Sequence, residues 1–375
     1  METKDILLIL MNFAGSLAVF LYAMKLMSEG LQKVAGSQLR AALARFTDRP
    51  LKGILTGVGV TAAIQSSSAT TVMVVSFVNA GLLSLGGAVA VIMGANIGTT
   101  VTAWIITLLG LGGKAGLFSL PLTLAAVSLY FLMSKRDRMR SIGQTVIGLA
   151  LLLVGMDLLQ KAMPDLSQYP QMLQGIASLS GYGFWSVLIF IAIGALLTCV
   201  VQASAAMMAI TLVMCYNGWI GLDVAVALVM GQNIGTTITA NLAAAVSNTA
   251  GKKAARAHLL FNVVGVLLTL AVFSPMMTLV ANFTTSVSGA DPRLYAESIP
   301  LAISFFHTLF NVGNTLILVW FIPQLLWLVD RMVNPDKQSR LALLLMQISR
   351  ALRKFGCRCS YVLRWLYGMH REYNT

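Results

Sequence analysis

The chain alternates long apolar stretches with short polar and basic segments, and this alternation predicts its architecture. Ile6–Met24 contains no charged residue, and Leu82–Leu109 contains none either. A helix of about 20 apolar residues is long enough to cross the hydrocarbon core of a bilayer. The pattern therefore predicts an all-α polytopic membrane protein.

The composition excludes several other classes. Hydrophobic residues make up 57% of the 375 residues and charged residues 10%, whereas soluble domains carry about 25% charged residues. A soluble enzyme, a secreted disulfide scaffold and a disordered tail do not fit these values. The net charge of +13 resides in short loops and in the last 45 residues, which is typical of a membrane-topology signal and not of a nucleic-acid binder.

Two polar motifs occur twice at one fixed spacing. Gly94-Ala-Asn-Ile-Gly-Thr-Thr100 recurs as Gly231-Gln-Asn-Ile-Gly-Thr-Thr237, and Gln65-Ser-Ser-Ser-Ala69 recurs more loosely as Gln202-Ala-Ser-Ala-Ala206. One offset of 137 residues serves both pairs. Chance similarity between apolar segments would not keep a common register through two polar motifs, so the pattern indicates an internal duplication.

Basic residues give each copy an orientation. They cluster in Ser28–Lys52, in Ser134–Ser141 and around Lys252–Arg256, and basic loops face the cytoplasm. The N-terminus then lies outside, and Leu51–Ala80 must enter and return on one side as a re-entrant helical hairpin with a polar tip. Gly183–Asn217 is its counterpart from the opposite face, so the two copies are predicted to be inverted-topology repeats.

The predicted spans and basic loops divide the chain into four parts. They are a first inverted repeat at 1–141 (hairpin about 51–80, broken span about 82–109), a second at 142–281 (hairpin about 183–217, broken span about 220–246), an additional transmembrane span at 282–330, and a basic amphipathic cytoplasmic tail at 331–375.

The polar tips are the candidate functional site. Irregular backbone at membrane depth is tolerated only where protein buries it or water reaches it, and secondary transporters build their sites from broken helices near the midplane. Free N–H groups at helix N-termini attract anions, and freed carbonyls and hydroxyls suit Na⁺. Both Asn-Ile-Gly-Thr-Thr copies are expected to break a span at their glycine, and the duplicated tips predict a solute site.

Few other groups compete for that role. Lys25 and Asp157 lie near the predicted span ends. His258 and His307 are each followed by Asn four residues on, which favours hydrogen-bonded helix–helix contacts over a proton relay. Gly110-Leu-Gly-Gly-Lys114 is followed by Ala and is no phosphate-binding loop, so neither an ATP-driven pump nor an enzyme is predicted.

At these motifs the chain resembles the type II sodium–phosphate cotransporter family, in its bacterial branch. The resemblance implies two inverted repeats and Na⁺-driven symport of inorganic phosphate by alternating access, with the phosphate site at the hairpin tips. Carried onto this sequence, it implies phosphate contacts from Ser66, Ser67, Ser68, Thr70 and Ser204. For the co-transported Na⁺ it implies Gln65, Gln202, Ser204, Thr100 and Thr237, with no further metal. From the twin motifs, Asn96 and Asn233 join the candidate phosphate ligands.

The chain departs from the family pattern in two places. Ala203 and Ala205 stand where the second tip usually has serines, which removes two hydroxyl ligands and leaves sodium stoichiometry and substrate open. Many bacterial relatives continue into a domain resembling the phosphate-signalling protein PhoU, whereas this chain ends in a basic segment. That segment is expected to form an amphipathic helix on the anionic inner leaflet, with a packing helix as the alternative.

Three alternative functions stay open at this point. They are a Na⁺-coupled carrier or exporter of another oxyanion, a passive anion channel lined by both tips, and a non-transporting sensor. The expected location is the bacterial inner membrane, with the C-terminus cytoplasmic, phosphate, sodium and the bilayer as partners, and no nucleic acid. A homodimer is compatible with the sequence.

Overall fold

The computed structural model describes residues 3–45, 49–111, 114–132, 137–164 and 178–333, and all regular elements in these ranges are helices. The α-helices are α1 (Thr3–Arg45), α2 (Pro50–Ile64), α3 (Ser67–Asn79), α4 (Leu85–Ile105), α5 (Lys114–Leu132), α6 (Asp137–Ala162), α8 (Phe184–Val201), α9 (Ser204–Tyr216), α10 (Leu222–Ala244), α11 (Thr249–Ala271), α12 (Phe273–Ser288), α13 (Ile299–Leu318) and α14 (Ile322–Met332). A π-helical turn, Ile106–Gly110, continues α4.

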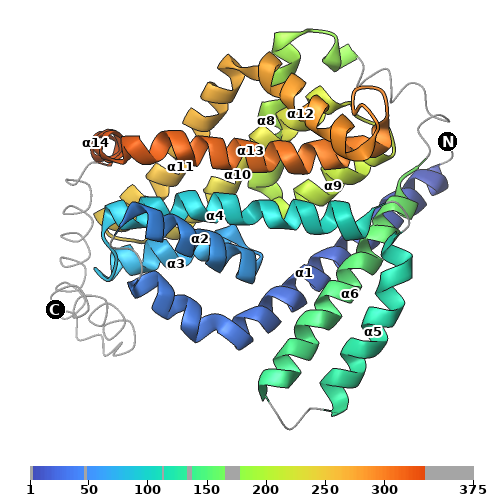
Figure 1. Ribbon diagram of the computed structural model, residues 1–375, viewed down its shortest axis with the longest axis horizontal. Helices are drawn as coiled ribbons and strands as arrows, with labels where there is room; N and C mark the ends of the chain where they lie inside the picture. The colour runs from blue at the N-terminus through green and yellow to red at the C-terminus, as the bar shows by residue number, and fades with distance from the viewer. Residues whose placement is uncertain (1–2, 46–48, 112–113, 133–136, 165–177, 334–375) are drawn as a thin grey trace, which may run out of the picture.

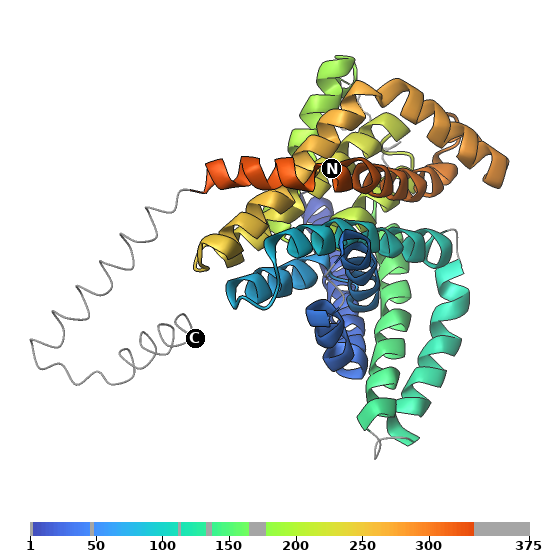
Figure 2. The same cartoon turned by 60° about the vertical axis from the view of Figure 1, so that its left-hand side comes forward.

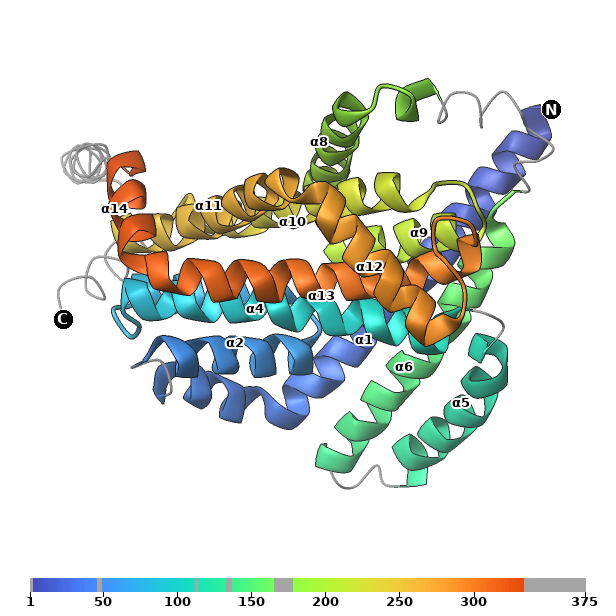
Figure 3. The ribbon, with the colours of Figure 1, turned by 45° about the horizontal axis from the view of Figure 1, so that its top comes forward.

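Two long helices form the centre of the molecule. α4 and α13 pack against each other and run side by side through it (Figure 1). α2 packs along α4, and α8 packs along α10. α1, α6 and α5 form an arm that projects from this body (Figure 2), while α10 and α11 lie on the other side of α4 from α2 (Figure 3).

The helix boundaries repeat at the offset found in the sequence. α2 ends at Ile64 and α8 at Val201, α3 begins at Ser67 and α9 at Ser204, and α4 and α10 begin at Leu85 and Leu222. Each boundary lies 137 residues after its counterpart. The duplication is therefore present in the local structure as well as in the motifs.

Reciprocal glycine contacts hold each copy together. A Cβ at Gly94 of α4 would collide with the carbonyl oxygen of Ile54 in α2, and one at Gly231 of α10 would collide with that of Ile191 in α8. Small residues let helix backbones approach closely where apolar lipid gives no hydrophobic driving force. The glycines thus place α4 and α10 directly against the helices that lead to the two tips.

The predicted breaks in the Asn-Ile-Gly-Thr-Thr spans are wrong. α4 and α10 run through both motifs without interruption. A Cβ at Gly98 would lie 2.8 Å from Cβ of Thr61, and one at Gly235 would lie 2.7 Å from Cβ of Thr198. These motif glycines permit close packing between helices. A helix that neighbouring helices hold on several sides can continue through a glycine.

Other span boundaries also differ from expectation. α1 continues to Arg45 through the segment predicted as a loop from Ser28, because no proline occurs before Pro50. The apolar segment that follows the second broken span divides at Val272 into α11 and α12, where Pro275 supplies no N–H to continue the helix. The predicted amphipathic tail lies mostly outside the described residues.

Several helical segments match the expectation of a multi-pass membrane protein. Among the described residues, six are long and apolar enough to cross a membrane by length and composition: Leu7–Gly36, Leu85–Gly110, Asp137–Ala162, Phe184–Val201, Thr249–Ala271 and Ala296–Met332.

The glycine contacts generate a stability prediction. Gly94→Ala should lower the free energy of unfolding by about 1–3 kcal/mol, because the added methyl has no space against the α2 backbone. Gly86→Ala is the matched control in the same helix, since a Cβ there meets nothing within 4 Å. Thermal unfolding of both purified variants measures the difference, and equal midpoints would contradict the packing argument.

Candidate functional site

Each copy of the repeat contains a break at the equivalent glutamine, Gln65 in the first and Gln202 in the second. Their φ values are 56° and 54°, and they are the non-glycine residues with positive φ in the described ranges. A left-handed conformation costs a non-glycine residue roughly 1–3 kcal/mol and often marks a functional site. Helix breaks are therefore present within 51–80 and 183–217, where the sequence predicts the polar tips, and each separates two helices.

Side chains from two other helices stabilise the first break. The Ser28 hydroxyl of α1 donates to the carbonyl of Ile64 at 2.7 Å, and Thr102 of α4 donates to Oε1 of Gln65 at 3.0 Å. Gln65 Nε2 donates back to the carbonyl of Ala62 at 2.6 Å. The polar groups released where α2 ends thus find partners.

The two tips differ in how the next helix begins. Ser66 caps α3, because its hydroxyl accepts a hydrogen bond from the backbone N–H of Ala69 at 3.2 Å. Ala203 occupies the same position before α9 and has no side chain that can cap it. Gln65 is buried, whereas Gln202 is exposed. The first tip therefore has a capped helix and a buried glutamine, whereas the second tip has an uncapped helix and an exposed glutamine.

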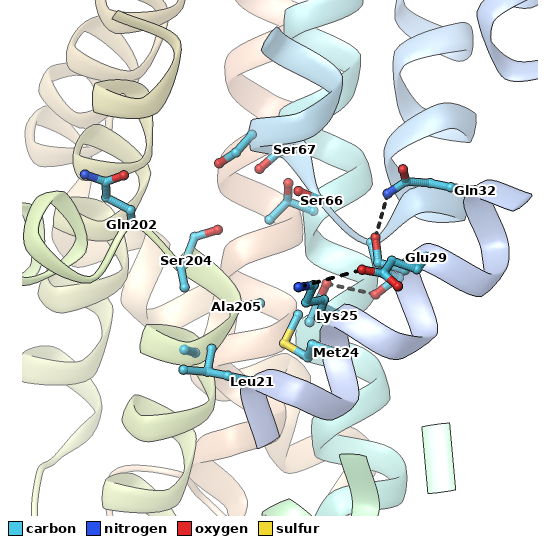
Figure 4. Close-up of a pocket in the computed structure, with 17 residues that line it drawn as sticks. Leu21, Met24, Lys25, Glu29, Gln32, Ser66, Ser67, Gln202, Ser204 and Ala205 are labelled. Atoms are coloured by element: carbon cyan, nitrogen blue, oxygen red, sulfur yellow. Dashed lines mark hydrogen bonds and ion pairs between the residues drawn. The ribbon is translucent and has the colours of Figure 1, made fainter. Parts of the chain in front are cut away.

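Both tips line one cavity of about 430 Å³, and α1 forms another of its walls (Figure 4). Ser67, Ser68 and Ser204 line it, and their hydroxyls make no hydrogen bond within the described part of the chain. The N-terminal ends of α3 and α9 also reach this cavity. Uncommitted hydroxyl donors together with helix N-termini form a binding environment suited to an oxyanion.

A smaller cavity of about 20 Å³ adjoins the first, and Ser67 and Ser204 line both. Asn96 of α4, Asn233 of α10 and His307 of α13 also line the smaller cavity. His307 Nε2 lies 3.3 Å from Oδ1 of Asn233. Three helices from different parts of the chain thus support the tips with buried polar groups.

The structure brings together most of the sequence-predicted residues. The larger cavity is lined by Gln65, Ser66, Ser67, Ser68, Gln202 and Ser204, and the smaller one includes Asn96 and Asn233. Thr70, Thr100 and Thr237 line neither cavity. The Thr70 hydroxyl lies 3.0 Å from that of Thr61, and those of Thr100 and Thr237 donate to carbonyls one turn back, each at 2.8 Å.

Sequence reasoning missed a second group of lining residues. They are Thr99, Thr102, Thr236, Gln232, His307, Lys25 and Glu29. The histidine motif was expected to make hydrogen bonds between helices. Asn311 instead donates to the carbonyl of His307 in its own helix at 2.8 Å, while His307 itself contacts another helix through Asn233. The shared spacing of Thr99 and Thr102, one turn apart, was the signal available for those two.

Comparison with known proteins agrees with this geometry. The family model described as Na+/Pi-cotransporter matches residues 19–161 and 184–289, which include both tips and both Asn-Ile-Gly-Thr-Thr motifs. The chain belongs to this family. Family members are transporters and not enzymes, and the six helical segments that are long and apolar enough to cross a membrane agree with a multi-pass membrane protein of this Na⁺/Pi-cotransporter family.

Two bacterial relatives match most of the chain, and a human relative matches a shorter part of it. It is 32% identical to YqeW of Bacillus subtilis over 84% of this chain and 95% of that protein. It is 30% identical to the "Putative inorganic phosphate export protein YjbB" of Escherichia coli O157:H7 over 84% of this chain, and spans 54% of that relative. It is 37% identical to the human "Sodium-dependent phosphate transport protein 2B" over 27% of this chain and 15% of that protein. No solved structure was found to match.

The uncapped second tip yields a prediction. Ala203→Ser should raise the free energy of unfolding by about 1 kcal/mol, because a serine hydroxyl there accepts the N–H of Ala206 as Ser66 accepts that of Ala69. Thermal unfolding of the purified variant measures the gain. Ala205→Ser is the control, because Ala205 is the second residue of α9 and a serine there adds the same hydroxyl outside the capping position. An equal gain in stability from both variants would refute the capping explanation.

Proposed function

We propose that the chain is a Na⁺-coupled transporter of inorganic phosphate that works by alternating access. The observation that carries the proposal is the convergence of two helix breaks on one cavity lined by uncommitted hydroxyls. Family membership supports phosphate as the substrate class. Two inverted repeats, each with a re-entrant hairpin, would let one half of the molecule move against the other around this cavity.

Phosphate would bind to the hydroxyls and to the helix N-termini. Ser66, Ser67 and Ser68 at the first tip and Ser204 at the second can donate to its oxygens, and the N-termini of α3 and α9 contribute partial positive charge. Asn96 and Asn233 line the adjoining smaller cavity and are further candidate phosphate ligands. Thr70 bonds to Thr61 and to the carbonyl of Ser66, so it would hold the first tip in position.

Sodium would bind where the preceding helices end. Carbonyl groups at the C-terminal ends of α2 and α8 carry partial negative charge, and Gln65 and Gln202 add amide oxygens. Co-bound Na⁺ would offset the charge of the phosphate dianion. Ser204 is the shared candidate for both ions, while Thr100 and Thr237 remain sodium candidates on the sequence pattern alone.

Export is the second candidate for the direction of transport. A relative that is 30% identical over most of this chain is named as a phosphate export protein, so outward transport across a bacterial inner membrane is the alternative to uptake. We place the N-terminus outside on the strength of the basic loops, and a homodimer remains a prediction.

Uptake of labelled phosphate into proteoliposomes tests the proposal. With inward Na⁺ and K⁺ gradients of equal size, accumulation above equilibrium is expected only with Na⁺, because only a coupled carrier can concentrate its substrate. Reversing the Na⁺ gradient in preloaded vesicles measures export. Equal, non-concentrative flux in both salts would identify a passive channel, and the absence of phosphate flux would exclude phosphate as the substrate.

Ser67→Ala tests the assigned tip. Loss of a hydroxyl that hydrogen-bonds a dianion should lower kcat/KM for phosphate at least about tenfold, since such bonds contribute about 1.5–3 kcal/mol. Ser76→Ala is the matched control in α3, because its exposed hydroxyl only bonds back to the carbonyl of Val72. Normal uptake by well-expressed Ser67→Ala protein would remove Ser67 from the site.

A further inference from the structure

α1 carries three charged residues inside a segment that is long and apolar enough to cross a membrane, and one of them, Lys33, donates to Oε1 of Gln144 in α6. Lys25 and Glu29 lie within the candidate span Leu7–Gly36, and Lys25 Nζ is 3.8 Å from Oε1 of Glu29. Ionisable residues inside membrane spans are rare, face a cavity or the bundle interior, and mark the path of substrates or ions. A charged pair in a candidate span therefore calls for a functional explanation.

The pair lines the cavity between the two tips. Lys25 and Glu29 are its only charged residues among the described lining residues. Figure 4 shows the pair on the α1 wall, with Ser66 and Ser67 on one neighbouring element and Ser204 on another. An anion at the tip hydroxyls would therefore share its aqueous space with one ammonium and one carboxylate.

The ion pair itself is loose. Its side chains are 72% and 44% exposed, and its atoms are 3.8 Å apart. Lys161 and Asp157 in α6 have the same four-residue spacing and a similarly exposed lysine, and their atoms are 2.6 Å apart. An ammonium group has three hydrogen-bond donors, so Lys25 can exchange a distant carboxylate for a nearer anion.

We infer that Lys25 is an anion-binding residue of this cavity and that Glu29 competes with the transported anion for its ammonium group. This inference rests on the proposed function and adds a residue to its site. In the empty cavity the two charges balance each other, which lowers the desolvation penalty of closing and reorienting the unloaded site. When phosphate binds, its two negative charges displace the single charge of Glu29 from Lys25.

Phosphate-dependent uptake kinetics in proteoliposomes test this assignment. Lys25→Met should raise the KM for inorganic phosphate at least about fivefold, consistent with the loss of one solvent-screened charge contact, while Lys25→Arg should retain most of the affinity. Glu29→Gln should lower the KM about twofold or more, because it removes the competitor and keeps the ammonium.

The double variant separates anion binding from a structural role. If Lys25 served only to neutralise Glu29, Lys25→Met with Glu29→Gln would restore the wild-type KM; if Lys25 binds the anion, the KM stays at least about fivefold raised. Lys161→Met is the matched control, because it removes the equivalent lysine of an ion pair outside the cavity, and its KM should be unchanged.

The outcomes distinguish a failure of the Lys25 assignment from a failure of the proposed function. Wild-type uptake of phosphate with an unchanged KM in Lys25→Met overturns the assignment of Lys25 alone. A wild-type protein that moves no phosphate overturns the proposed function together with this assignment. If Lys25→Met does not yield folded protein, Glu29→Gln decides the matter, since an unchanged or raised KM there contradicts the competition.

Discussion

A helix that breaks within an apolar body exposes carbonyl and N–H groups that must find partners, and this requirement governs the structure. At the first break the partners are side chains of α1 and α4, with Ser28 bonded to Ile64 and Thr102 bonded to Gln65. α4 reaches the break because α2 and α4 pack at glycine distance. Close packing, the broken helices and the cavity are thus one connected arrangement.

Duplication supplied the same backbone twice, and substitution made the two copies chemically different. The first tip has a capping serine and a buried glutamine, whereas the second has Ala203 and an exposed glutamine. Because Ala203 has no hydroxyl, the first N–H groups of α9 lack the side-chain partner that Ser66 gives to α3.

The wall contributed by α1 gives the cavity its charge. Removing a charge from water costs free energy unless an opposite charge compensates it. Lys25 and Glu29 offer a pair that is neutral when the cavity is empty and open to exchange when an anion arrives. The hydroxyls would then supply geometry and the lysine would supply charge, while co-bound Na⁺ completes the compensation.

The sequence by itself determined the helical class, the offset of the repeat, and the breaks at Gln65 and Gln202, because apolar run length and duplicated polar motifs are local properties of the chain. It did not determine which hydroxyls face the cavity. Thr100 and Thr237 bond back to their own helices, while Thr99 and Thr102 line the site. That choice depends on how each helix is rotated against its neighbours. Only the tertiary structure placed α1 beside the tips and His307 against Asn233, since these contacts join segments far apart in the chain.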